Sequence, residues 1–358
     1  MVGFEDAVVV ETGVDKSVLV ALDRDGRETG RVEGDSLVQP SPDGEPVFAV
    51  WLKEDPYTFD LGTGHTAAYS VAGGELRELW RVPGSLVDVS AETVVVQSSD
   101  RKVSLIPWDS ESAGAASWTG TADHAVVVDE YLFTVDGTTI TLRDATNGQS
   151  RWDYTGLALT PETVTTAAVT ADYAVFLADG TLAWVELKDG SEVSRAAEGG
   201  GDLRWVGENR LVATPPASFD HSVPAIAYAF DGSAEVVKSA DFGRSRNIAA
   251  SVRPAEGLGY VAFNGRLYDS DLNEVARYGT PDTWLVPISD GALVFGSGSS
   301  FRTSTVAHID PTTGEQNWLI ATPGIRVPFV EPAMNGMAVW HGWDGESTAL
   351  GTTVEFWS

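Results

Sequence analysis

Four long polar segments hold the side chains in this sequence that are best suited to recognising a ligand. They span residues 53–64, 214–222, 296–303 and 341–351, between short apolar runs. Aromatic rings beside carboxylates on loops favour contact with a peptide, a sugar or a lipid. The candidate binding residues are Asp55, Tyr57, Phe59, Phe219, Asp220, His221, Phe301, Arg302, His341, Trp343 and Asp344. Alternatively, each aromatic side chain only folds back over the end of its own structural unit.

Signals for catalysis or metal binding are weak. The five histidines show no zinc-ligand spacing, and no nucleophile-elbow, P-loop or dinucleotide-binding motif occurs. The run Asp23-Arg-Asp25-Gly26 resembles the start of a calcium loop but lacks the later acidic ligands, so we predict a simple turn there. We therefore predict no catalytic residue, no metal site and no cofactor.

The charge balance excludes one class of partner. The chain has 358 residues, with 23 Lys and Arg against 52 Asp and Glu, for a formal net charge of -29. Nucleic-acid binding depends on Lys and Arg, so we predict no nucleic-acid partner. The absence of cysteine excludes disulfides, thiolate metal sites and cysteine nucleophiles, and it leaves the redox compartment open.

The elements that must position the four segments are short β-strands. Helical periodicity is nearly absent, and apolar runs alternate with turns rich in Gly, Pro, Asp and Asn, with 37 Gly and 17 Pro in all. A unit of strands and polar turns recurs at the roughly 35–45-residue spacing of four-stranded propeller blades. The acids fall repeatedly in these turns, so much of the negative charge is interpreted as a solvated rim. The sequence thus predicts an all-β fold, a propeller of antiparallel four-stranded blades.

The number of blades follows from counting strands. Residues 85–324 hold six complete units, residues 1–84 offer six strands and the remaining carboxy-terminal residues offer three. Eight blades fit this count best, with seven as the alternative, and one blade would combine strands from both ends of the chain. Such closure leaves no exposed sheet edge. Residues 1–358 are interpreted as a single propeller domain.

Two of the units resemble a known family. The runs Asp144-Ala-Thr-Asn-Gly148-Gln-Ser-Arg-Trp152 and Asp310-Pro-Thr-Thr-Gly314-Glu-Gln-Asn-Trp318 are similar to the repeat signature of pyrroloquinoline-quinone-type (BamB-type) β-propellers. The resemblance implies that Trp152 and Trp318 lie on outer strands and pack between neighbouring blades. The other units share only spacing and turn chemistry.

The same resemblance bears on function. Quinone-dependent dehydrogenases of this family carry a vicinal cysteine pair over the cofactor, and this chain has no cysteine. The chain therefore looks like the family's non-enzymatic members, which include envelope scaffolds, and its composition resembles that of actinobacterial proteins. Our hypothesis is a non-catalytic, extracytoplasmic binding or scaffolding propeller of the cell envelope. Its partner would be a membrane protein or envelope assembly complex, or a lipid, glycolipid or glycan, bound at the long segments.

Two other function classes remain open. The chain could be an enzyme, either quinone-dependent or a hydrolase or lyase with acids and histidines at the ring centre. It could also be a carbohydrate-binding module that uses Tyr57, Phe301 and Trp343. No run of roughly 20 apolar residues is present, and the first residues do not form a signal peptide. We expect a signal or membrane anchor to precede this sequence in the natural protein.

Overall fold

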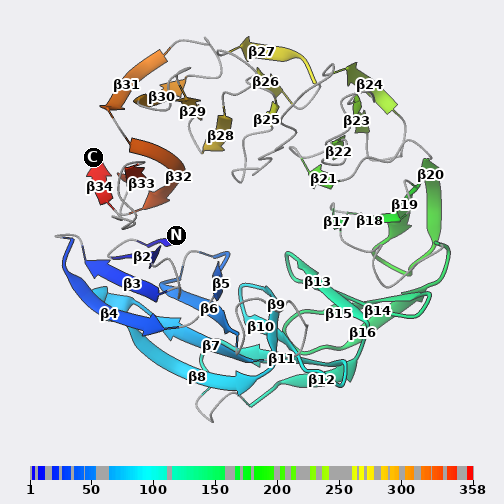
Figure 1. Cartoon of the computed structure of the whole chain (residues 1–358). Coiled ribbons are helices and arrows are strands. Elements are labelled where there is room, and N and C mark those ends of the chain that lie inside the picture. The colour runs from blue at the N-terminus through cyan, green and yellow to red at the C-terminus, as the bar shows by residue number, and fades with distance from the viewer. Residues whose placement is uncertain are drawn as a thin grey trace. The chain divides into compact units, whose positions relative to one another are not determined.

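A computed structural model gives the fold, and its described residues are almost all in β-strands and the tight turns that join them (Figure 1). Side chains beyond Ala196 are described only for residues 268, 269 and 272–274. The described residues are 2–4, 7–12, 18–23, 26–33, 36–43, 45–53, 64–110, 115–157, 166–169, 172–178, 181–196, 202–205, 211–214, 226–230, 236–241, 260–263, 266–269, 272–277, 284–288, 291–297, 303–309, 316–323, 325–333, 337–344 and 353–357.

The chain forms two compact units, residues 1–153 with 327–358, and residues 154–326. The first unit holds four sheets and most of a fifth. Their strands are β1 (Val2–Gly3), β2 (Ala7–Thr12), β3 (Val18–Asp23) and β4 (Glu28–Glu33); β5 (Ser36–Pro40), β6 (Val47–Leu52), β7 (His65–Ser70) and β8 (Arg77–Pro83); β9 (Ser85–Val89), β10 (Thr93–Gln97), β11 (Lys102–Pro107) and β12 (Trp118–Thr121); β13 (His124–Val128), β14 (Tyr131–Asp136), β15 (Thr139–Asp144) and β16 (Ser150–Tyr154); and β32 (Ile325–Ala333), β33 (Met337–Asp344) and β34 (Thr353–Trp357).

The second unit holds four sheets of the same kind. Their strands are β17 (Thr166–Val169), β18 (Tyr173–Ala178), β19 (Thr181–Glu186) and β20 (Glu192–Ala196); β21 (Asp202–Trp205), β22 (Leu211–Thr214), β23 (Ile226–Phe230) and β24 (Val236–Asp241); β25 (Tyr260–Phe263), β26 (Arg266–Asp269) and β27 (Glu274–Arg277); and β28 (Trp284–Ile288), β29 (Gly291–Ser297), β30 (Thr303–Ile309) and β31 (Gln316–Pro323). The one helix among the described residues is the 3₁₀ turn η1 (Ala72–Gly74).

The predicted fold class is confirmed, because most sheets are four-stranded, antiparallel and built from consecutive strands. Within the units, five pairs of first strands from neighbouring sheets lie side by side: β1 with β5, β5 with β9, β9 with β13, β17 with β21 and β25 with β28. This is how propeller blades are arranged. No helix of the described residues is long and apolar enough to span a membrane.

The expected blade count needs correction. Residues 85–323 form six sheets as predicted, but the described strands make nine sheets in all, and none of these combines strands from both ends of the chain. The sequence count missed β1 and β5, which complete the first two sheets. Both strands escape a hydrophobic-pattern search, since β1 is two residues long and β5 ends in Pro40.

The core lies between the faces of consecutive sheets. Successive side chains of one strand point to opposite faces, so a single strand contributes to the core on both sides of its sheet. Phe48 and Val50 of β6 pack with the first sheet, whereas Ala49 and Trp51 pack with the third. All five residues of β10 are buried: Val94 and Val96 face the second sheet, and Val95 faces the fourth. Middle strands therefore read as continuous apolar runs, while outer strands such as β16 alternate between exposed and buried positions.

Three outer strands share a feature that was not predicted from the sequence, a β-bulge that brings a Glu–Arg ion pair together. Where β4, β8 and β20 pair with the third strand of their sheet, the register shifts by one residue, which is a β-bulge. Each of these strands has a Glu three residues before an Arg, and the two side chains form an ion pair: Glu28–Arg31 (2.7 Å), Glu78–Arg81 (2.6 Å) and Glu192–Arg195 (2.7 Å). Without the extra residue, these side chains would lie on opposite faces of the strand.

Tyrosines extend two of these pairs. The Tyr69 hydroxyl donates to Glu78 Oε2 (3.1 Å), and the Tyr154 hydroxyl donates to Glu192. Burial, with the neighbouring carboxylate, raises the pKa of Tyr69 to about 12. The same causes raise the pKa of Tyr154. Both phenols therefore stay protonated at neutral pH and serve as donors.

One half-buried acid joins two sheets. Asp88 of β9 accepts the N–H of Val89 at Oδ1 (2.9 Å) and the N–H of Val127 of β13 at Oδ2 (2.8 Å). Burial raises the pKa of Asp88, although these two hydrogen bonds oppose the shift. Asp88→Asn removes one of the two carboxylate acceptors, so we expect a loss of about 1–3 kcal/mol in unfolding free energy.

The loss should depend on pH. A carboxyl with a raised folded-state pKa contributes most stability at low pH, and this contribution falls as pH rises above the ordinary value of 3.8 through the folded-state pKa. Urea unfolding of wild type and Asp88→Asn at pH 4 and pH 7 checks this. The advantage of the wild type should be smaller at pH 7, and an advantage that grows with pH would contradict the assignment.

Candidate functional site

Most of the candidate binding residues from the sequence lie outside the described residues. This holds for Asp55, Tyr57, Phe59, Phe219, Asp220, His221, Phe301 and Arg302. His341, Trp343 and Asp344 lie within strand β33 and not in a loop, because pairing with β34 continues through His341↔Val354 and Gly342↔Thr353. Their side chains are not described, so the binding role of all eleven residues stays a prediction.

The connections that hold these residues follow one topological rule. The four segments join β6 to β7, β22 to β23, β29 to β30 and β33 to β34. In every case these are the second and third strands of their sheet. In an antiparallel sheet this connection lies at the opposite end from the first-to-second and third-to-fourth connections.

Tryptophans on outer strands join consecutive sheets. Trp80 of β8 is buried, and its Nε1 donates to the carbonyl oxygens of Pro107 (3.1 Å) and Trp108 (3.2 Å) in the third sheet. Trp118 of β12 covers Gly148 in the fourth sheet, where Arg143 stacks on the indole at 4.8 Å. Trp152 is buried on the outer strand β16, as the repeat signature implies, and Trp318 lies on the outer strand β31.

Acids in the tight turns accept hydrogen bonds from backbone N–H groups. Asp144 accepts the N–H groups of Thr146 (3.0 Å) and Asn147 (3.2 Å). Asp23 accepts the N–H of Arg27 at its carboxylate (2.8 Å) and the N–H of Gly26 at its carbonyl (2.9 Å), as in a tight turn. These carboxylates stabilise the turns and are not free for chemistry.

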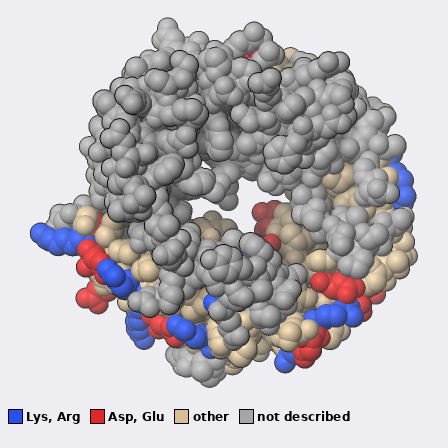
Figure 2. Space-filling view, viewed as in Figure 1, with Lys and Arg blue, Asp and Glu red and all other residues tan. Residues whose placement is uncertain are grey.

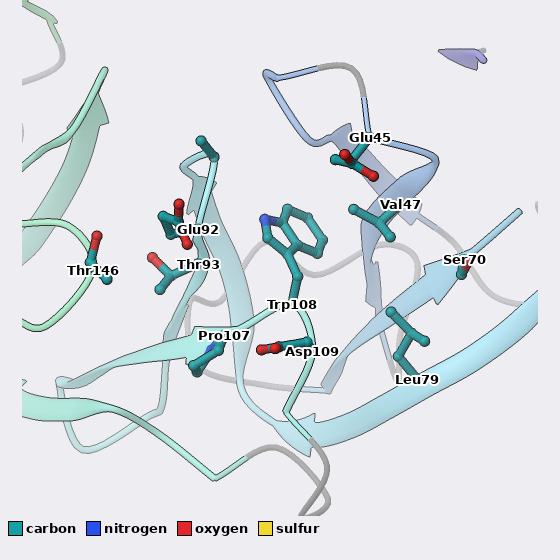
Figure 3. A pocket seen from close by; sticks show the side chains of 11 residues that line it. Glu45, Val47, Ser70, Leu79, Glu92, Thr93, Pro107, Trp108, Asp109 and Thr146 are labelled. Atoms are coloured by element: carbon teal, nitrogen blue, oxygen red, sulfur yellow. The ribbon is translucent and has the colours of Figure 1, made fainter. Parts of the chain in front are cut away.

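The first unit contains a groove of about 410 Å³ (Figure 3). It lies between the second and third sheets and reaches the β15–β16 turn of the fourth. Its lining comes from the first-to-second and third-to-fourth strand connections and the strand ends beside them. The lining residues are Glu45, Val47, Ser70, Leu79, Ala91, Glu92, Thr93, Pro107, Trp108, Asp109 and Thr146.

Hydrogen bonds fix the backbone around this groove. Thr93 Oγ1 donates to the Ala145 carbonyl of the fourth sheet (2.7 Å), and the Ser90 Oγ accepts the N–H of Thr93 (2.9 Å). Trp108 Nε1 donates to the Ser90 carbonyl (3.0 Å), which sets the orientation of the indole ring. In Figure 3 this ring lies between Glu92 and Thr93 on one side and Glu45 and Val47 on the other.

The described lining of the groove is acidic. It includes Glu45, Glu92 and Asp109, all exposed, and no Lys, Arg or His. On the face drawn in Figure 2, most of the described Lys and Arg side chains lie next to acidic ones. Among the described residues, no three His, Cys, Asp or Glu side chains come close enough to hold a metal ion. The groove can therefore attract a cation but is not built as a metal site.

Sequence reasoning missed this groove. The lining comes from separate segments between residues 45 and 146, none of which carries a motif. The groove could have been predicted only from the topology, because turns at the same end of neighbouring blades lie close together.

Comparisons with known proteins bear on the fold. No protein-family model and no curated protein matches the sequence. Among solved structures, the C-terminal WD40 domain of Sif2 is 10% identical, with 99% of this chain and 93% of that chain covered and a TM-score of 0.50. BamB from Moraxella catarrhalis is 12% identical, with 93% and 97% covered and a TM-score of 0.47. Hsv2 from Kluyveromyces lactis is 10% identical, with 89% and 94% covered and a TM-score of 0.47. The likeness to Sif2 supports the propeller fold and nothing further.

Proposed function

We propose that this chain is a non-catalytic binding or scaffolding propeller that engages its partner through the four long segments. The observation that carries the proposal is topological: all four segments join the second and third strands of their sheets. In a single propeller domain, these connections emerge on one face. Loops on a rigid β-scaffold are where binding residues are usually found.

The use of the described ionisable groups supports a binding role over catalysis. Asp88 holds two backbone N–H groups, Asp144 holds a turn, and Glu192 is occupied by Arg195 and Tyr154. Each of these acids is tied into the scaffold. Catalytic acids and bases would instead converge on a pocket with perturbed pKa values.

The proposed setting is the outer side of the cell envelope. Its support is the sequence resemblance of residues 144–152 and 310–318 to the BamB-type repeat, together with the lack of the cysteine pair of quinone enzymes. The partner is a membrane protein or envelope assembly complex, or a lipid or glycolipid of that envelope.

Site-specific photocrosslinking in native membranes tests this proposal. A photoreactive phenylalanine analogue replaces Tyr57, Phe219 or Phe301 in the segments. The matched control carries it at Lys188, an exposed position in the β19–β20 connection, which joins the third and fourth strands of its sheet. We expect the same membrane protein or glycolipid adduct from the segment positions and none from Lys188. Adducts at no segment position, or equal adducts at Lys188, would contradict the proposal.

The two other function classes have separate tests. Calorimetric binding of pyrroloquinoline quinone or calcium would favour the enzyme. A glycan array probed with wild type and with alanine variants of Tyr57, Phe301 and Trp343 tests the carbohydrate-binding module. Glycan binding that disappears in these variants would favour that module over a protein or lipid partner.

A further inference from the structure

We propose that the groove between the second and third sheets binds an arginine-bearing peptide segment of a partner protein. This goes beyond the proposed function, because it is a second binding surface. The long segment of the second sheet joins β6 to β7, whereas the groove is lined by the β5–β6 connection and its neighbours at the opposite strand end. A chain with both surfaces could hold two partners at once.

The shape and composition of the groove suit a peptide side chain. Its volume of about 410 Å³ lies within the range of small-ligand sites. Val47, Leu79, Pro107 and Trp108 supply apolar surface for the methylene groups of a long side chain. Among the polar lining residues, Thr146 is exposed, so its hydroxyl can hydrogen-bond to a peptide group.

The negative charge of the lining favours a positively charged ligand. Glu45, Glu92 and Asp109 come from three different connections, and the described lining contains no base to neutralise them. An anionic ligand would be repelled. A single metal ion does not fit, because these carboxylates do not gather around one point. A ligand whose positive charge is delocalised over several atoms is cationic and does not need the carboxylates to meet at one point.

Arginine matches the groove best among cationic side chains. Its planar guanidinium binds carboxylates in bidentate fashion and stacks on aromatic rings. This chain uses both contacts internally: Arg31 binds Glu28 through Nε (2.8 Å) and Nη2 (2.7 Å), and Arg143 stacks on Trp118 at 4.8 Å. In the groove, Trp108 lies between Glu92 and Glu45 and is 7% exposed, so a guanidinium bound to one of these carboxylates could contact the exposed part of the indole.

The site needs little rearrangement to bind. Trp108 is held by Ser90 and by the contact of its carbonyl with Trp80, and Thr93 is held by Ala145. A groove with fixed walls avoids the entropic cost of ordering them on binding.

The test is a fluorescence-anisotropy titration of the full chain with a labelled peptide of arginines separated by Gly-Ser pairs. The same peptide with citrulline in place of arginine keeps the shape without the charge. About 150 mM salt suppresses long-range attraction to the acidic surface. We expect saturable binding of the arginine peptide and no binding of the citrulline peptide.

Matched variants separate the groove from general acidity. Glu92→Gln with Asp109→Asn neutralises two groove acids, and Asp100→Asn with Asp136→Asn neutralises two acids at the opposite strand ends of the third and fourth sheets. Circular dichroism confirms that both are folded. We expect the groove variant to weaken binding about fivefold or more and the control to change it less than about twofold.

Several results would overturn the proposal. Equal weakening by both double variants would mean non-specific attraction, and no saturable binding by the wild type would mean no site. Displacement of the peptide by equimolar spermidine or calcium would assign the groove to a polyamine or a metal ion. The crosslinking positions Tyr57, Phe219 and Phe301 are not among the groove's lining residues, so the crosslinking experiment and the peptide titration can fail independently.

Discussion

Gly148→Ala is expected to lower the unfolding free energy by about 3 kcal/mol or more, the largest effect we predict for adding a single methyl group. Gly148 has a φ of 71°, in the left-handed region that other residues adopt at a cost. A Cβ there would lie 2.0 Å from Cγ of the Trp118 ring, which belongs to the preceding sheet. The substitution would therefore strain the turn and also push the two sheets apart.

Gly137→Ala is the matched control. Gly137 lies in the β14–β15 turn of the same sheet with a φ of 58°, and an added Cβ would meet nothing within 4 Å. It should therefore show only the backbone cost, about 1 kcal/mol. Guanidinium unfolding of both variants measures the difference. Equal losses would mean that the contact with Trp118 contributes nothing to stability.

The role of Gly148 shows how far the sequence could go. The sequence predicted strands joined by polar turns, and in one such turn, residues 144–148, Asp144 accepts the N–H groups of Thr146 and Asn147. The packing of Trp118 on the glycine could not be predicted, because the two residues belong to different sheets and no local pattern links them.

The same distinction applies to the fold as a whole. Strand periodicity and turn spacing were enough to predict a propeller and the six sheets of residues 85–323. The two-residue strand β1 and the bulged Glu–Arg pairs escaped notice, since neither is an apolar pattern. The groove escaped because its charge is assembled from separate turns.

The net charge of -29 also takes on a more specific meaning. Three acids on outer strands are paired with arginine, as Glu28–Arg31, Glu78–Arg81 and Glu192–Arg195, whereas the interpretation of the turn acids as a solvated rim stays a prediction. Exposed pairs of this kind contribute little stability each. A group of acidic residues without basic residues among its described neighbours, as in the groove, is therefore the feature that could favour a cationic partner.

Trp80→Ala is expected to be the most destabilising substitution, at about 3–5 kcal/mol. Trp80 is 3% exposed and packs with Leu86, Val94 and Ile106 of the third sheet. Its removal would leave a cavity between two sheets and two carbonyl oxygens without their shared donor. Chemical unfolding followed by far-ultraviolet circular dichroism measures the loss.

A second variant separates packing from hydrogen bonding. Trp80→Phe keeps most of the apolar contact but has no N–H, so we expect a loss of about 1–2 kcal/mol plus a small cavity cost. An indole isostere with sulfur in place of N–H at position 80 would remove the hydrogen bonds alone. Because Pro107 and Trp108 line the groove, both variants should also weaken binding of the arginine peptide. Full peptide affinity in a chain that has lost these bonds would show that Trp80 stabilises the sheets without positioning the groove.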